Sequence, residues 1–229
     1  MKNLKDLETK IGLHFKNRAL LENAFIHRSY LNENKHFYLP SNEKLEFLGD
    51  SVLSLITSSY LYKHYPSLRE GDYTEIKAAV VRTESLSEAA KSLRLGKYLY
   101  LSKGQDLEKG RENQNILADC FEALIGAIFL DFGFQKAYRF VLQYLYDGRL
   151  EVIIKNNLYL SPKSRLQEYS QSVYKGTPRY QVLEEIGPEH LRIFKVAVYI
   201  NNKLSGTASG KSKKEAEELA AKKALEKLT

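Results

Sequence analysis

Two pairs of acidic residues stand at helical spacing inside apolar stretches of the chain. Glu46 and Asp50 are four residues apart, and Asp119 and Glu122 are three apart. In an α-helix, each spacing places both acids on one face. Like charges so placed destabilise an isolated helix by about 0.2–0.5 kcal/mol. A cation held between the carboxylates is the simplest explanation of both pairs.

Carboxylate oxygens are hard ligands that suit Mg²⁺, with Mn²⁺ as a substitute. Four of them on two facing helices can hold one or two ions and leave positions for water and a substrate phosphate. The alternative is that the four residues are ordinary solvated acids on helix edges.

The helices that must position these acids are indicated by apolar residues at helical spacing. Ser41 or Asn42 is the expected cap of the first acidic helix, whose apolar stripe comprises Leu45, Leu48, Val52, Leu55 and Ile56. The second spans residues 117–132, where Gly126 indicates close helix–helix approach. Asn17 is the expected N-cap of an earlier helix. Because β-type alternation is weak before residue 158, we predict an all-α first domain.

Charge and proline placement divide the chain. It has 229 residues and a net charge of +7. Residues 1–158 hold 22 basic and 20 acidic residues (22 − 20 = +2), and residues 159–229 hold 13 and 8 (13 − 8 = +5). Pro162 is suited to opening a new helix. We predict one domain over 1–154, a linker over 155–161 and a second domain over 162–229.

The second domain has an α-β-β-β-α pattern. Helical spacing over 163–174 precedes strands at 179–185, 194–200 and 203–209, with a turn at Asn201–Asn202. Ser212 and Glu215 fit a capping box that opens the last helix. The lysines around this start, Lys211, Lys213 and Lys214, suit a phosphate clamp, because a helix N-terminus already favours anions. A solvated basic turn is the alternative.

Composition excludes several classes of protein. The single cysteine, Cys120, excludes a disulfide framework and a Cys-rich zinc site, and it fits a reducing compartment. No apolar run approaches the length of a membrane span, and the N-terminus is too charged for a signal peptide. We therefore expect a cytoplasmic protein with an anionic partner, without membrane contact or an organic cofactor.

Three motifs resemble the signature of the ribonuclease III family. They are Ile26–Tyr30 (IHRSY), Asn42–Leu53 (NEKLEFLGDSVL) and Ile116–Ala127 (ILADCFEALIGA). Gly210–Glu217 (GKSKKEAE) is similar to the end of a double-stranded-RNA-binding domain. The resemblance covers nearly the whole chain, in the domain order of the bacterial family.

This resemblance implies an all-α ribonuclease III endonuclease domain followed by an α-β-β-β-α RNA-binding domain. It also implies a homodimer that cleaves double-stranded RNA with Mg²⁺. The expected products carry 5′-phosphate and 3′-hydroxyl ends with short 3′ overhangs. The expected substrates are ribosomal RNA precursors and other structured transcripts, including messenger and transfer RNA precursors.

The family's site residues carry over by position. The metal carboxylates fall on Glu46, Asp50, Asp119 and Glu122, with Asp50 and Glu122 expected to be catalytic. Further positions correspond to site or interface acids (Glu43, Glu70), to a polar residue near the cleavage site (Asn115), to minor-groove contacts (Gln167, Glu168, His190) and to phosphate contacts (Lys213, Lys214). Ala208 stands where many relatives have glycine, and we expect this departure to have a small effect.

Other interpretations remain open at this point. His27, Arg28 and Ser29 are either a catalytic triad or a packing and capping cluster, and we favour the second because a metal hydrolase needs no serine nucleophile. Cys120 is interpreted as a core residue. The rival functions are a non-catalytic RNA-binding protein whose degenerate nuclease domain serves dimerisation, and a Mg²⁺ hydrolase of nucleotides. The presence of all four carboxylates argues against the first, and the basic C-terminal domain argues against the second.

Overall fold

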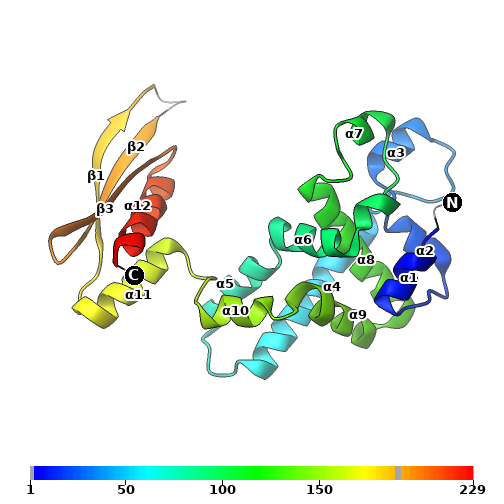
Figure 1. Cartoon of the computed structure of the whole chain (residues 1–229), viewed down its shortest axis with the longest axis horizontal. Helices are drawn as coiled ribbons and strands as arrows, with labels where there is room; N and C mark the ends of the chain where they lie inside the picture. Colours follow the sequence, from blue (N-terminus) through cyan, green and yellow to red (C-terminus); the bar gives the residue numbers. More distant parts are fainter. Residues whose placement is uncertain (1–2, 189–191, 229) are drawn as a thin grey trace. The chain divides into compact units, whose positions relative to one another are not determined.

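The computed structural model describes residues 3–188 and 192–228. The chain forms two compact units, Met1–Ile153 and Ile154–Thr229, each with its own arrangement of elements (Figure 1). Among the described residues, no helix is both long enough and apolar enough to cross a membrane.

The first unit is helical, as predicted. Its elements are α1 (Lys5–Ile11), α2 (Arg18–Asn23), α3 (Arg28–Glu33), α4 (Glu43–His64), α5 (Glu70–Val80), α6 (Thr83–Leu93), the 3₁₀ turn η1 (Leu95–Tyr98), α7 (Lys103–Leu107), α8 (Gln114–Phe132), α9 (Phe134–Val141), the π-helical turn η2 (Leu142–Tyr146) and α10 (Arg149–Lys155), which runs past the boundary. Within its described residues, β pairing is limited to one isolated bridge between Ile26 and Tyr100.

The helix α8 is central to this unit. Most of its residues are buried, and it packs against α2, α4, α6 and α9. Asn113 caps its start by accepting the N–H groups of Asn115 and Ile116. The preceding loop is anchored by the Arg111 guanidinium, which binds both carboxylate oxygens of Asp106 at 2.8 and 2.9 Å. The position of α8 is therefore fixed along its length and at its beginning.

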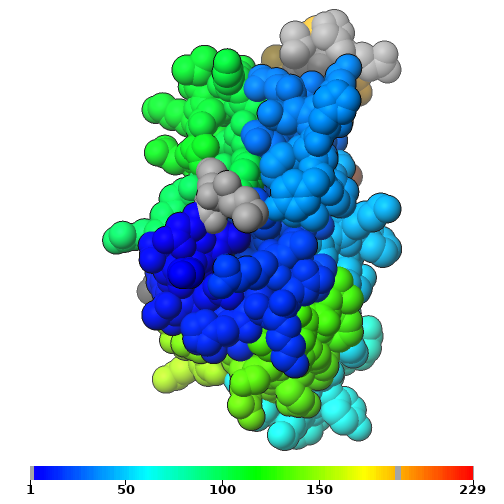
Figure 2. Space-filling view, turned by 90° about the vertical axis from the view of Figure 1, so that its right-hand side faces the viewer, coloured from blue at the N-terminus to red at the C-terminus, as the bar shows by residue number. Residues whose placement is uncertain are grey.

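The segment that leads into α7 packs against α3. The N–H of Ser102 donates to Ser29 Oγ at 3.1 Å, and the N–H of Lys103 donates to the Glu33 carboxylate. Figure 2 shows the N-terminal residues in blue covering one face of the unit, with the green segment that carries α7 beside them.

The second unit has the predicted α-β-β-β-α order. Its elements are α11 (Pro162–Tyr174), β1 (Arg179–Ile186), β2 (Ile193–Ile200), β3 (Lys203–Gly210) and α12 (Lys213–Leu228). The strands form one antiparallel sheet in the order β1-β2-β3, and α12 packs against the sheet and α11. Asn201 and Asn202 both have positive φ, which is typical of a tight hairpin turn. Ala208 is buried in the core that the sheet forms with α12.

Some details of the predicted helices are confirmed and others are wrong. Asn17 caps α2 by accepting the N–H of Ala19. Asn42 precedes α4, but its side chain makes no capping bond; its amide donates instead to the carbonyl of Ala24. Leu55, predicted in the apolar stripe of α4, is 56% exposed. Its position on the helix points away from the core of its own chain.

Candidate active site

The two acidic helices, α4 and α8, touch through their backbones. A Cβ atom built on Gly49 would overlap the carbonyl of Glu122, and one built on Gly126 would overlap the carbonyl of Leu45. Glycine is therefore required on both sides of this contact, which confirms the close approach predicted at Gly126. The contact places the acidic residues of α4 beside those of α8.

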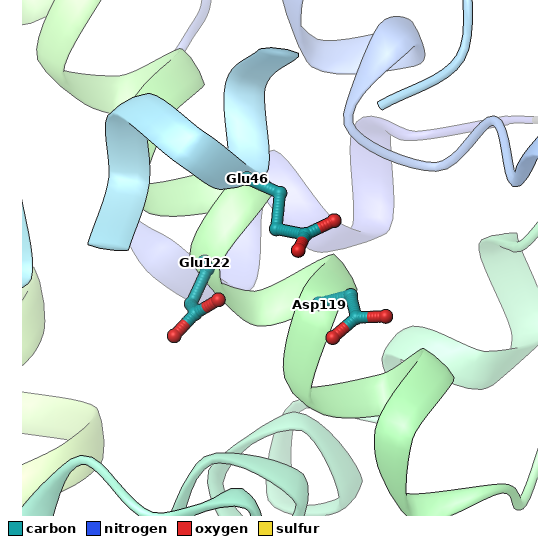
Figure 3. Close-up of side chains that lie close together, drawn as sticks. All are labelled: Glu46, Asp119 and Glu122. Atoms are coloured by element: carbon teal, nitrogen blue, oxygen red, sulfur yellow. The ribbon is translucent and has the colours of Figure 1, made fainter. Parts of the chain in front are cut away.

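Three of the predicted carboxylates converge between these helices. Glu46, Asp119 and Glu122 each offer an oxygen atom that lies within 4.8 Å of the other two, and all three residues are partly buried. Figure 3 shows their carboxylates directed into a common space, Glu46 from α4 and the other two from α8. Three hard oxygen donors at this separation fit a divalent cation.

The electrostatics of this cluster favour a cation as well. Burial, with the negative charges of Asp50, Glu46 and Asp119, raises the pKa of Glu122 to about 8. Burial also raises the pKa of Glu46 and of Asp119, and the positive charge of the nearby Arg28 guanidinium partly offsets this rise in both. The carboxylates thus disfavour simultaneous ionisation unless positive charge enters the space between them.

The fourth predicted ligand, Asp50, lies outside the group of three. It follows Glu46 by one turn of α4 and is exposed. Its charge is nevertheless the strongest charge effect on the pKa of Glu122. Asp50 therefore adds negative potential to the cluster, although the structure does not bring it within the same ligand distance.

The cluster opens into a cavity of about 290 Å³. Its lining residues are His27, Arg28, Asn42, Glu43, Glu46 and Asp119. The predicted acid Glu43 lies here, with its carboxylate 3.7 Å from the Arg28 guanidinium. Asn42 and Arg28 were not predicted as site residues, because nothing in their spacing separates them from capping and surface positions.

The remaining predictions for this domain lie elsewhere. Glu70 begins α5, where its carboxylate accepts the Thr74 hydroxyl, and it is not part of the cluster. Asn115 is exposed one turn before Asp119 on α8. Cys120 is fully buried, and burial raises the pKa of its thiol far above the usual value, so the core interpretation is confirmed.

His27 and Ser29 make structural bonds. His27 is the N-cap of α3, and its Nδ1 accepts the N–H of Ser29 and lies 2.8 Å from Ser29 Oγ. Burial, followed by the charge of Arg28, lowers the pKa of His27, so the imidazole is neutral at pH 7. Because Ser29 Oγ also accepts the N–H of Ser102, the capping interpretation is confirmed.

Four of the predicted RNA contacts of the second unit, Gln167, Glu168, Lys213 and Lys214, lie on its two helices. Gln167 and Glu168 are adjacent exposed residues of α11. His190 lies outside the described residues. Lys211, Lys213 and Lys214 are exposed around the start of α12, and in the part of the chain that the structure describes no carboxylate pairs with their ammonium groups.

The capping box at the start of α12 is modified. Ser212 Oγ accepts the N–H of Glu215 at 3.1 Å, as predicted. The Glu215 carboxylate, however, accepts the N–H of Lys211 at 2.6 Å rather than that of Ser212. This bond holds the turn before the helix in place. The backbone that carries the lysine side chains is therefore fixed at this point.

Known proteins share both halves of this architecture. The family described as Ribonuclease-III-like matches residues 17–148, and the Double-stranded RNA binding motif matches residues 162–228. The chain is 46% identical to Ribonuclease 3 of Chloroflexus aurantiacus over 97% of this chain and 90% of that protein. It is 44% identical to Ribonuclease 3 of Treponema denticola over 98% of this chain and 91% of that protein.

A solved structure adds a match for the first unit. The nuclease domain of ribonuclease III from Campylobacter jejuni aligns with a TM-score of 0.59 and 36% identity, covering 63% of this chain and 97% of that one. The helical fold, the carboxylate cluster and the αβββα unit thus define a two-domain nuclease that carries a double-stranded-RNA-binding domain. The chain belongs to the ribonuclease III family and is an endoribonuclease.

Proposed function

We propose that this endoribonuclease uses Mg²⁺ to cleave double-stranded RNA into products with 5′-phosphate and 3′-hydroxyl ends and short 3′ overhangs. The observation that carries the proposal is the convergence of Glu46, Asp119 and Glu122 in one partly buried space. Family membership and the presence of an RNA-binding domain support the substrate class.

The residues of the cluster have defined roles in this proposal. Glu46, Asp119 and Glu122 hold the ion, and Asp50 adds its charge from the exposed side. An ion held by these residues would supply an activated water and would stabilise negative charge on the phosphate. Glu122 must lose its proton before it can bind the ion, because its pKa of about 8 leaves the free carboxyl largely protonated at neutral pH.

The second domain supplies binding without sequence reading. We propose that Gln167 and Glu168 contact the minor groove and 2′-hydroxyl groups, while Lys213 and Lys214 contact phosphates. A domain of this type spans about 16 base pairs and recognises the A-form shape. His190 completes this proposed set, which gives the enzyme affinity for any sufficiently long duplex.

We further propose a homodimer. Phe47, Leu55 and Tyr62 stand along α4 at a spacing of eight and seven residues, and their exposures are 78%, 56% and 77%. Such spacing aligns them on one helix face, and an aligned exposed apolar stripe is typical of a protein interface.

Phe47→Asp should shift the mass measured by light scattering from dimer to monomer. Val173→Asp, at an exposed apolar residue of the second domain, should not; a dimeric Phe47→Asp protein would contradict the proposal.

The domain limits and biological role are proposals of the same kind. We propose a nuclease domain over 1–154, a linker over 155–161 and the RNA-binding domain over 162–229, supported by the division of the chain at Ile153 and by the two matched ranges. Processing of ribosomal, messenger and transfer RNA precursors in the cytoplasm is the role that we infer from family membership.

Cleavage of a long RNA duplex tests the main proposal. The wild-type chain should cut the duplex with Mg²⁺ and not with EDTA, and labelled ends should show 5′-phosphate and 3′-hydroxyl groups. An Asp50→Asn variant should bind the duplex and cut it far more slowly. A wild-type chain that shifts the duplex on a gel but never cuts it would favour the non-catalytic alternative.

A further inference from the structure

The cavity beside the carboxylate cluster contains one permanent positive charge. Of its six lining residues, Glu43, Glu46 and Asp119 are acidic, His27 is neutral at pH 7, and Arg28 carries a guanidinium. Arg28 lines this cavity together with Glu46 and Asp119, so its guanidinium lies beside two carboxylates of the cluster. The Arg28 guanidinium can therefore interact with an anionic group that enters the cavity.

The fold makes little use of Arg28. Its side chain is 74% exposed, and its ion pair with Glu43, at 3.7 Å, is long and lies at the surface. Exposed pairs of this kind contribute little to stability. Glu43 already accepts the Ser41 hydroxyl at 2.7 Å. The neighbouring residues His27 and Ser29 make the bonds that hold α3 in place. Arg28 is therefore able to exchange its partner without disturbing the helix.

An RNA strand entering this site meets strong repulsion. Its phosphates carry negative charge, and the cluster with Asp50 and Glu43 presents five carboxyl groups. The planar fork of arginine matches two phosphate oxygens at once. We propose that Arg28 leaves Glu43 and binds a backbone phosphate of the RNA duplex next to the carboxylate cluster. This inference rests on the proposed cleavage of RNA at the cluster.

The proposal predicts opposite effects on RNA and on metal. Replacing Arg28 by alanine removes one phosphate contact, so kcat/KM for duplex cleavage should fall about five- to tenfold at 0.15 M salt, and its log–log salt slope should flatten by about one. Mn²⁺ affinity without RNA should stay equal or rise, because a positive charge near the carboxylates has been removed. A residue that merely held the carboxylates in place would lower metal affinity instead.

The experiment compares the full-length wild type with Arg28→Ala, Arg28→Lys and Lys44→Ala. Lys44 is the matched control, because it is an exposed cation next to Glu43 that does not line the cavity. Arg28→Lys should recover part of the cleavage rate and most of the salt slope, and Lys44→Ala should match the wild type.

Mn²⁺ binding is measured by calorimetry on the RNA-free proteins. Arg28→Ala cleavage within twofold of the wild type with the same slope would overturn the inference, and so would a loss of Mn²⁺ affinity. A wild type that cleaves no duplex would instead refute the proposed function, so the two failures are distinguishable.

Discussion

Gly49 and Glu122 are in direct contact across the helix pair, because the Cα atom of Gly49 faces the carbonyl of Glu122 with no room for a side chain. Gly49 lies between Glu46 and Asp50 on α4, and Glu122 is itself a member of the cluster. One backbone contact therefore sets the distance between the acids of the two helices.

Substituting Gly49 tests this relationship. Gly49→Ala should destabilise the protein by about 1–3 kcal/mol, because overpacking forces the helices apart, and it should reduce cleavage further than the loss of folded protein explains. Urea unfolding and a duplex cleavage assay measure both effects. Gly71→Ala is the control: no atom lies within 4 Å of a Cβ there, and α5 is exposed at that point. Equal stability of the two variants would contradict the contact.

Substituting Glu122 separates catalysis from binding. Glu122→Gln keeps the shape of the side chain and removes its charge, so cleavage should be lost while the affinity for duplex RNA stays within about twofold. The free energy of unfolding of the metal-free protein should not fall, because like-charge repulsion is relieved. Glu75→Gln, an exposed position on α5, is the charge-matched control. Weaker RNA binding by Glu122→Gln would assign this residue to the RNA instead of the metal.

The raised pKa of Glu122 gives the metal-free protein a specific pH dependence. In the unfolded chain this carboxyl titrates near its usual value of 4.5, and in the folded chain near 8. Between these values the unfolded chain releases the proton first, so the stability contributed by the protonated group is lost as pH rises. Thermal unfolding in EDTA from pH 5 to 8 should show this decline, and Glu122→Gln should reduce it.

The affinity for divalent ions should change in the opposite direction. A proton must leave Glu122 when the ion binds, so Mn²⁺ affinity should rise from pH 6 to pH 8 and binding should release protons into the buffer. Calorimetry in two buffers of different ionisation enthalpy measures the number of protons. Proton release that is the same in Glu122→Gln would place the titrating group elsewhere.

The lysines at the start of α12 should determine salt dependence. Lys213→Ala with Lys214→Ala removes two proposed phosphate contacts, so duplex affinity should fall about 10- to 30-fold at 0.15 M salt and the log–log slope should flatten by about two. Lys222→Ala with Lys223→Ala removes the same charge from exposed positions further along the helix. Equal slopes in the two double variants would remove the phosphate-clamp assignment.

Local patterns predicted most of the fold. Helical spacing located α4 and α8, and the residues Asn201–Asn202 and Ser212 marked the last turn and the last helix, because each signal depends only on neighbouring residues. The exposure of Leu55 was not predictable, since an apolar residue at helical spacing has the same pattern whether its own chain or another covers it. The Asn42 side chain does not cap α4, because its amide donates instead to the carbonyl of Ala24, eighteen residues away.

The candidate site was predicted in part for a similar reason. Spacing along each helix identifies pairs of acids, but the distance between helices depends on packing. The structure brings Glu46 to Asp119 and Glu122 and leaves Asp50 outside that group. Arg28 was missed as a site residue because the cavity brings together residues of α3, α4 and α8, which no short motif records.

The burial of α8 has a consequence for how the enzyme loses activity. Asp119 and Glu122 stand on a helix surrounded by α2, α4, α6 and α9, so their backbone amides exchange with solvent only when much of the first unit opens. Hydrogen exchange around these residues should be among the slowest in the chain. Thermal inactivation should coincide with cooperative unfolding of the first unit, and the second unit can unfold separately without dispersing the carboxylates.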